Sequence, residues 1–220
     1  MKKILTMLVL LNGPAALAQQ TAAPHIPATG RRLTDFIPAG YEVLNDGQAT
    51  GDLNRDGRPD AALVLRSKAE YKETAETAEA PPRYLVVLFG TPTGFALAAQ
   101  ASRVMLRQDD GGAFGDPFAG IDIAKGVLSI SHYGGSSWRW SHTDKFRYQA
   151  GSFYLIGETR VSYQNNTDCA QGNWEMHDTN FVTGEYRVEK ESEACKPLVN
   201  KRGKNPPKPL RKLVDYAVEP

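Results

Sequence analysis

Short apolar runs, separated by turn residues, recur along most of the chain. Two of them, residues 60–65 (DAALVL) and 84–89 (YLVVLF), are almost continuously apolar. Runs of this kind predict central strands that are covered on both faces, and we expect these two to pair in antiparallel fashion. The segment between them, 67–83, is rich in charge and alanine and ends in Pro81-Pro82 and Arg83. It is expected to form either a short exposed helix or a hairpin loop.

From Gly94 onward the pattern predicts a β-meander. Hairpin turns are expected at 124–126, 149–152 and 183–184, each between segments in which apolar and polar residues alternate. Helical periodicity is weak everywhere except in the last residues. We therefore predict one all-β domain over residues 33–199, antiparallel, built as a sandwich or as a partial propeller-like sheet, with disordered termini.

The two ends of the chain carry different signals. Residues 1–18 have the basic start, the short apolar run and the Ala-Leu-Ala end of a secretory signal peptide, which predicts a periplasmic or extracellular protein without a transmembrane segment. Residues 19–32 are rich in Ala, Thr and Pro and are predicted to be a disordered linker. Residues 200–220 are predicted to be a basic, proline-rich tail, either solvated or in contact with an anionic envelope polymer.

Charge and cysteine content narrow the class of protein. Loss of Lys2 and Lys3 with the signal peptide leaves 24 basic against 25 acidic residues, and near neutrality argues against a nucleic-acid partner. The chain has two cysteines, Cys169 and Cys195, and in an exported protein these predict a disulfide. Such a bridge contributes about 3–4 kcal/mol in the chain-entropy model.

The segment 51–65 (GDLNRDGRPDAALVL) has the spacing of a calcium loop. Oxygen-bearing side chains stand at positions 1, 3, 5 and 9 of this loop, and a glycine stands at position 6. Ca²⁺ requires six to eight oxygen ligands at about 2.3–2.6 Å, and short side chains around a glycine turn supply them. Leu63 occupies the position of the bidentate Glu of an EF-hand, and a strand follows instead of a helix. The predicted ligands are Asp52, Asn54, Asp56, Asp60 and the backbone carbonyl of Arg58.

This segment resembles the D-x-[DN]-x-D-G-x-x-D unit of FG-GAP and VCBS repeats, which occur in integrin-type propellers and in many secreted bacterial proteins. The resemblance covers about 20 residues and occurs once, whereas a propeller needs at least four blades. The segment 114–157 also resembles small secreted bacterial proteins of unknown function that carry one such loop. The resemblance implies a calcium cofactor with a structural role and an exported location, but no activity.

The segment 132–145 (HYGGSSWRWSHTDK) offers a second candidate site. Trp138, Trp140, His142 and Asp144 have one parity, so a continuous strand places them on one face. One interpretation packs this face against a second sheet. The other uses Tyr133, Trp138 and Trp140 as an aromatic platform for a glycan or another cell-envelope component.

Catalytic chemistry has little support in the sequence. His132, His142 and Asp144 suggest a catalytic or zinc cluster, but no metalloprotease, hydrolase or Cys/His metal motif accompanies them. Asp109, Asp110 and Asp116 lie in a glycine-rich loop that is expected to be a connector. We therefore predict a non-enzymatic, secreted, calcium-stabilised binding or structural module of unknown partner, and the alternative is a carbohydrate- or cell-wall-binding protein.

Overall fold

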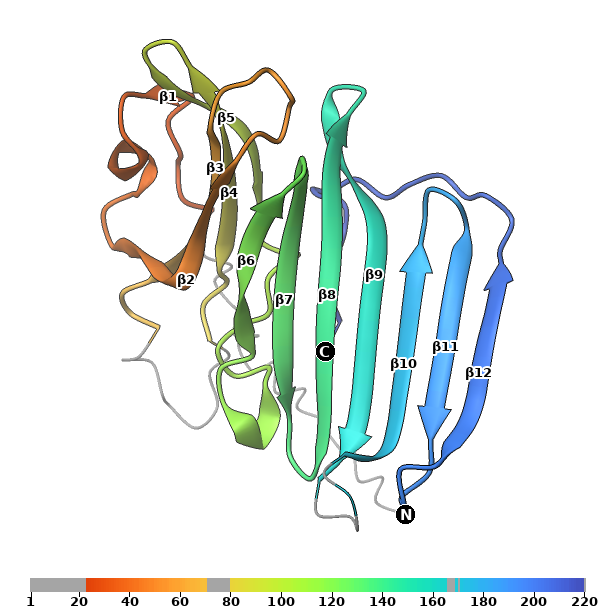
Figure 1. Cartoon of the computed structure of the whole chain (residues 1–220). Helices are drawn as coiled ribbons and strands as arrows, with labels where there is room; N and C mark the ends of the chain where they lie inside the picture. The colour runs from red at the N-terminus through yellow and green to blue at the C-terminus, as the bar shows by residue number, and fades with distance from the viewer. Residues whose placement is uncertain (1–22, 71–79, 166–168, 170, 220) are drawn as a thin grey trace, which may run out of the picture.

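Two antiparallel sheets make up the part of the chain that the computed structural model describes, residues 23–70, 80–165, 169 and 171–219 (Figure 1). The all-β prediction is confirmed. The five-stranded sheet has the order β1-β5-β4-β3-β2. Its strands are β1 (Thr29–Gly30), β2 (Tyr41–Gly51), β3 (Asp60–Ser67), β4 (Tyr84–Thr91) and β5 (Gly94–Ala101).

The seven-stranded sheet has the order β12-β11-β10-β9-β8-β7-β6 and is a continuous meander. Its strands are β6 (Phe118–Ala124), β7 (Val127–Gly135), β8 (Trp138–Gln149), β9 (Ser152–Gln164), β10 (Gly172–Asn180), β11 (Glu185–Glu191) and β12 (Pro197–Lys204). Two short 3-10 helices, η1 (Leu33–Phe36) and η2 (Gly112–Phe114), lie outside the sheets.

The predicted hairpin turns are confirmed. The turns after β6 and β8 each place two residues at positive φ, Lys125 with Gly126 and Ala150 with Gly151. Positive φ at both central positions is the geometry of a type I′ turn, whose twist matches that of the flanking strands. The order of the large sheet therefore follows from short local connections.

The two apolar runs form the centre of the five-stranded sheet. β3 and β4 pair as predicted, with Ala61 opposite Leu88 and Leu65 opposite Tyr84, and residues 61–65 and 85–88 are fully buried. Side chains of one parity face the large sheet. Those of the other parity form a second core, which the N-terminal segment covers with Ile26 and Phe36.

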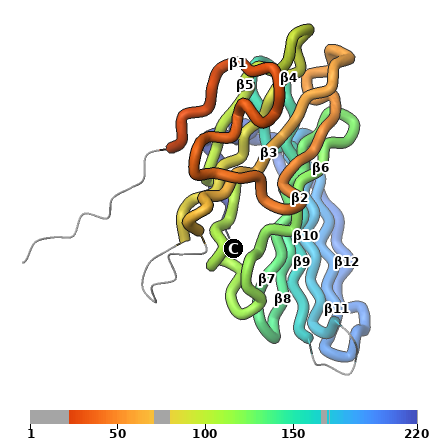
Figure 2. The backbone as a smooth tube through the Cα atoms, turned by 90° about the vertical axis from the view of Figure 1, so that its left-hand side faces the viewer, coloured from red at the N-terminus to blue at the C-terminus, as the bar shows by residue number. Residues whose placement is uncertain are grey.

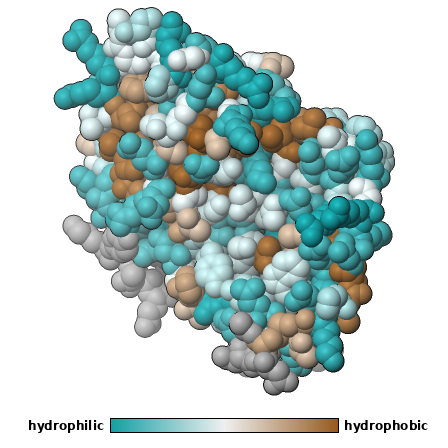
Figure 3. Space-filling view, viewed as in Figure 1, coloured by the Kyte–Doolittle hydropathy of each residue, from teal (hydrophilic) through white to brown (hydrophobic). Residues whose placement is uncertain are grey.

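The core between the sheets lies against only part of the large sheet. It draws side chains from β6–β9, such as Ile130 and Phe146, and among the described residues it draws none from β10–β12. Figure 1 shows these last three strands extending beyond the five-stranded sheet, and Figure 2 gives the same arrangement from the side. The view in Figure 3 shows a mostly hydrophilic surface over the lower half of the long strands.

The structure differs from two predicted boundaries. Residues 23–32, placed in the linker, contribute the buried Ile26 and the strand β1, which pairs with β5. The tail predicted over 200–220 begins inside β12 and then returns across the large sheet (Figure 1). Lys212 of the tail pairs with Tyr154, in the first residues of β9, which precede Gly157 and do not pair with β10. Leu213 and Tyr216 of the tail are buried. The predicted signal peptide lies outside the described residues.

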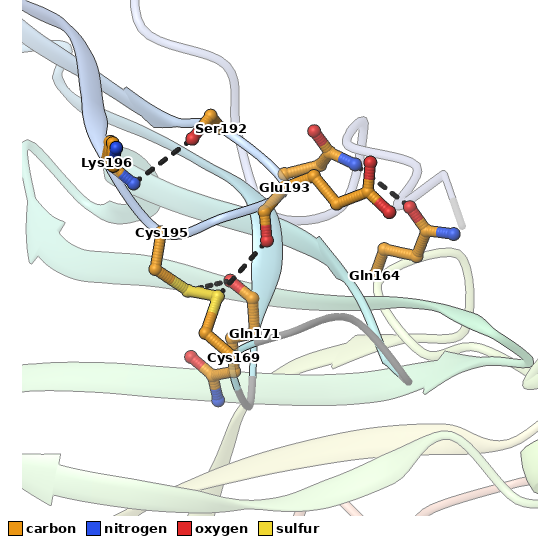
Figure 4. The surroundings of a disulfide bond; sticks show 8 residues. Gln164, Cys169, Gln171, Ser192, Glu193, Cys195 and Lys196 are labelled. Atoms are coloured by element: carbon orange, nitrogen blue, oxygen red, sulfur yellow. Dashed lines mark hydrogen bonds between the residues drawn. A yellow bond between two sulfur atoms is a disulfide. The ribbon is translucent and has the colours of Figure 1, made fainter.

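The predicted disulfide is confirmed. Cys169 and Cys195, with Cα atoms 6.1 Å apart, join the connection between β9 and β10 to the turn between β11 and β12 (Figure 4). The sulfur of Cys169 lies 3.2 Å from the carbonyl oxygen of Glu193. The bridge therefore fastens the end of the meander that the second sheet does not cover. The described residues contain no helix long and apolar enough to cross a membrane.

Candidate functional site

One face of β8, β9 and β10 carries three rows of polar side chains. It is the face that parity predicts for Trp140, His142 and Asp144, and the side chains of residues 142, 144 and 146 on it are buried. Antiparallel register places residues of the three strands directly beside one another. The rows are Trp140–Ser162–Glu175, His142–Arg160–His177 and Asp144–Glu158–Thr179.

A buried His–carboxylate cluster lies at the centre of this face. The Nε2 atom of His142 lies 3.1 Å from Oδ1 of Asp144 and 3.5 Å from Oε2 of Glu158. These are ion-pair contacts rather than aligned hydrogen bonds: neither ring nitrogen of His142 has a hydrogen-bond partner, and neither has the Oδ2 atom of Asp144. Tyr216, from the returning tail, donates its hydroxyl to Oδ1 of Asp144 at 3.0 Å. The tail therefore contributes to the site.

The charges of this cluster depend on one another. Burial alone would lower the pKa of His142, but the carboxylates of Asp144 and Glu158 raise it to about 9. Burial would raise the pKa of Glu158, but His142 and Arg160 lower it to about 2. The Tyr216 hydroxyl has a raised pKa because it is buried beside Asp144. At neutral pH the arrangement is thus a cationic imidazole between two carboxylates.

His132, on β7, lies directly opposite His142, and its pKa is shifted in the opposite direction. Burial, and then the cationic His142, lower its pKa to about 3, so its ring is neutral at neutral pH. Its Nε2 atom accepts a hydrogen bond from the backbone amide of Leu106 at 3.3 Å. His132 and His142 are therefore paired across neighbouring strands, but His132 does not belong to the group of close ligand atoms that His142 forms with Asp144 and Glu158, and its Nε2 atom is bonded to the backbone.

A pocket of about 370 Å³ opens beside the cluster. The indole of Trp140 lines it and rests on the backbone of Gly134, where a Cβ atom would lie 2.6 Å from the ring. Glu175, at its edge, contacts His177 at 2.5 Å and Lys190 at 2.7 Å. His177 also lines the pocket, together with Ser141, His142, Arg160, Val161, Ser162 and Glu219.

The three aromatic residues of the predicted platform do not share one surface. Tyr133 lies on the opposite face of the sheet from Trp140, because it pairs with Ser141 while Trp140 pairs with Gly134. Its hydroxyl lies 2.9 Å from that of Tyr163, and the ring of Phe114 meets it edge-on. Trp138 has the parity of Trp140 but does not line the pocket, and 51% of its surface is exposed.

In the predicted calcium loop, side-chain oxygens accept hydrogen bonds from the loop's own amides. Asp52 accepts from the amides of Asp56 and Gly57 at 3.1 and 3.0 Å, and Asp56 accepts from the amide of Arg58 at 2.8 Å. Asn54 accepts from the amide of Asp56 at 3.0 Å. The bonds of Asn54 and Asp56, each to the amide two residues on, are typical of Asx turns, whereas those of Asp52 cross the loop, and all of them direct the oxygens toward the loop's own backbone.

Asp60 has a different environment from the rest of the loop. Its carboxylate is fully buried and accepts hydrogen bonds from the amides of Leu53, Asn54 and Gly90, at 2.7, 3.2 and 2.8 Å. Within the described residues, Asp52, Asp56 and Asp60 do not form a group in which the ligand atoms all lie within 4.8 Å of one another, whereas His142, Asp144 and Glu158 do. Calcium binding at this loop stays a prediction.

A buried ion triad was not predicted from the sequence. Arg83 is fully buried and forms paired contacts with Glu70, at 2.8 and 3.2 Å, and with Asp116, at 2.7 and 2.6 Å. Asp109, from the same glycine-rich loop as Asp116, accepts from the amide of Ala80 at 3.0 Å. These acids connect the loop to the start of β4, in agreement with its interpretation as a connector.

Several residues of the pocket and the cluster were also missed. Glu158 with Arg160, and Glu175 with His177, are i, i+2 pairs on strands that follow β8 in the meander. Consecutive antiparallel strands that each carry such a pair place them on adjacent positions, so this repeated spacing was the available signal. Tyr216 and Glu219 carry no local signal, because their position depends on the path of the tail.

No protein-family model, no curated protein and no solved structure matches this chain. The comparisons therefore give no positive indication of an enzymatic activity.

Proposed function

We propose that this protein is an exported binding module whose pocket beside Trp140 holds a saccharide of the cell envelope. The composition of the pocket carries the proposal. An indole lies next to Arg160, Glu175, His177 and Ser162, which all have side chains that hydrogen-bond. A sugar ring presents a flat C–H surface for stacking and a rim of hydroxyl groups for such partners.

The size of the pocket agrees with this ligand. Its volume of about 370 Å³ is at the lower end of the range of about 300–1,000 Å³ for small-molecule sites. The disulfide between Cys169 and Cys195 supports an oxidising compartment, where envelope saccharides occur.

A glycan array that includes peptidoglycan fragments tests the proposal, followed by calorimetry with the best ligand. Trp140→Ala is expected to weaken binding at least tenfold, which corresponds to about 1.4 kcal/mol. Trp138→Ala is the matched control, since it removes a second indole of the same strand and face that does not line the pocket. Equal losses in the two variants, or no saturable saccharide binding by a folded protein, would contradict the proposal.

We also propose that Ca²⁺ binds the loop of Asp52, Asn54, Asp56 and Asp60, with the Arg58 carbonyl, and stabilises the module. The proposal is supported by the ligand spacing and by the inward direction of the Asp52 and Asn54 oxygens. Ca²⁺ calorimetry should give saturable heat with the mature protein and a strongly reduced signal with Asp56→Ala. A flat titration with the parent protein, or equal heats from both proteins, would exclude the site.

A further inference from the structure

We infer that His142, Asp144 and Glu158 form a binding site for a divalent transition-metal ion such as Zn²⁺. The three residues offer one imidazole nitrogen, which releases its proton to solvent when a metal ion binds, and two carboxylates, and their ligand atoms lie within 4.8 Å of one another. They come from the neighbouring strands β8 and β9, so the sheet itself holds them in position. This inference is independent of the proposed saccharide and calcium sites.

The spacing of the atoms agrees with a metal site. Zn²⁺ binds nitrogen and carboxylate oxygen at about 2.0–2.2 Å, so neighbouring ligands of a tetrahedral site lie about 3.3–3.6 Å apart. The distances from Nε2 of His142 to Oδ1 of Asp144 and Oε2 of Glu158, 3.1 and 3.5 Å, are close to this separation. The ligand atoms of Asp144 and Glu158 lie within 4.8 Å of each other.

Unpartnered buried atoms provide an independent observation. His142 and Asp144 are 3% and 1% exposed, and the Nε2 atom of His142, which lies near both carboxylates, has no aligned hydrogen bond. The Nδ1 atom of His142 and the Oδ2 atom of Asp144, which are not among the proposed ligand atoms, have no hydrogen-bond partner either. A buried polar atom without a partner is costly and requires an explanation such as an ion. The only other such side-chain atoms among the described residues belong to His132 and Arg139.

The residues around the three proposed ligands fit a metal centre in two respects: they hold the carboxylates in place, and they leave one coordination position open. Tyr216 donates to Asp144 at 3.0 Å, and Arg160 contacts the second oxygen of Glu158 at 2.9 Å, so both carboxylates are oriented by a further residue. His142 lines the pocket beside Trp140, which leaves room for a fourth ligand from solvent.

Zinc calorimetry on the mature chain tests this site, with excess Ca²⁺ present to occupy the calcium loop. One zinc ion per chain is expected. Glu158→Gln, which preserves side-chain shape, should weaken zinc binding at least tenfold, and His142→Gln should abolish it. Circular dichroism checks the fold of each variant, and if His142→Gln fails to fold, Glu158→Gln decides.

Two control variants locate the ion. His25→Gln removes an exposed histidine, and His177→Gln removes the histidine on β10 that lies in the same row as His142 but outside the three proposed ligands; both variants should bind zinc as the parent does. Loss of binding in His177→Gln, unchanged binding in Glu158→Gln, or no saturable zinc binding by the parent would overturn the inference. Because sugar binding is measured separately, failure here leaves the saccharide proposal standing, and the reverse also holds.

Discussion

Replacement of Asp60 by alanine should destabilise the protein even when no calcium is present. The carboxylate is buried and accepts three backbone hydrogen bonds, from Leu53, Asn54 and Gly90. A buried donor left without a partner costs about 1–3 kcal/mol. The Leu53 amide is buried, whereas water can reach those of Asn54 and Gly90 in part. We therefore expect a loss of about 3–5 kcal/mol in the free energy of unfolding.

Urea unfolding in EDTA, followed by tryptophan fluorescence, measures this loss. Asp56→Ala is the matched control, because its carboxylate lies in the exposed part of the same loop, and its cost in EDTA should stay below about 1 kcal/mol. If Asp60→Ala loses less than about 1 kcal/mol in EDTA but loses all stabilisation by Ca²⁺, our reasoning is refuted. Asp60 would then act only as a metal ligand.

Two further predictions concern buried charge. Arg83→Met should cost about 3–5 kcal/mol of unfolding free energy, because it leaves Glu70 and Asp116 without their cation; a loss under about 1 kcal/mol in urea unfolding would contradict this. Since folding lowers the pKa of His132 to about 3, its stabilising contribution is complete above about pH 6.5 and declines as the pH falls toward 3. The stability difference between the parent and His132→Gln should therefore shrink by up to about 1.4 kcal/mol per pH unit below pH 6.5, and a constant difference from pH 7.5 to 5 would exclude it.

Local signals were sufficient to predict the strands and turns of the meander. The turns at 124–126 and 149–152 lie where the sequence places them, because alternation and turn chemistry act over a few residues. The continuous apolar runs also identified β3 and β4 as central strands. By contrast, β1 has two residues, Thr29 and Gly30, and exists only through its pairing with β5.

The return of the tail had no comparable signal. Its prolines and basic residues predict an extended, solvated chain. Two side chains, Leu213 and Tyr216, are nevertheless buried in the core, and two backbone hydrogen bonds join the tail to Phe153 and Leu155. Composition cannot distinguish these two buried residues from the exposed residues of the tail. Their burial depends on where the pairing of β10 with β9 ends, because the tail lies against the part of β9 that β10 leaves unpaired.

Within the site, parity predicted that Trp140, His142 and Asp144 share one face of β8. It did not predict which residues of the neighbouring strands lie beside them. Glu158 reaches His142 only because β8 and β9 pair in one register, with Asp144 opposite Glu158. A shift by one residue would turn Glu158 to the other face of the sheet. Tyr133 was grouped with Trp138 and Trp140 by proximity in sequence, although the turn between β7 and β8 places it on the opposite face.

The energetics of the His142 cluster favour a functional explanation over a structural one. Replacing a buried ionic group by apolar residues of similar volume is often neutral or stabilising, so folding alone does not require the cluster. The neighbouring positions Ile130 and Phe146 show that this part of the sheet accommodates apolar side chains. The cluster instead keeps two carboxylates and three unpartnered polar atoms beside a pocket. Local rules of stability are most often broken at functional sites, and on this ground we expect the ligand chemistry of the protein to be centred on His142.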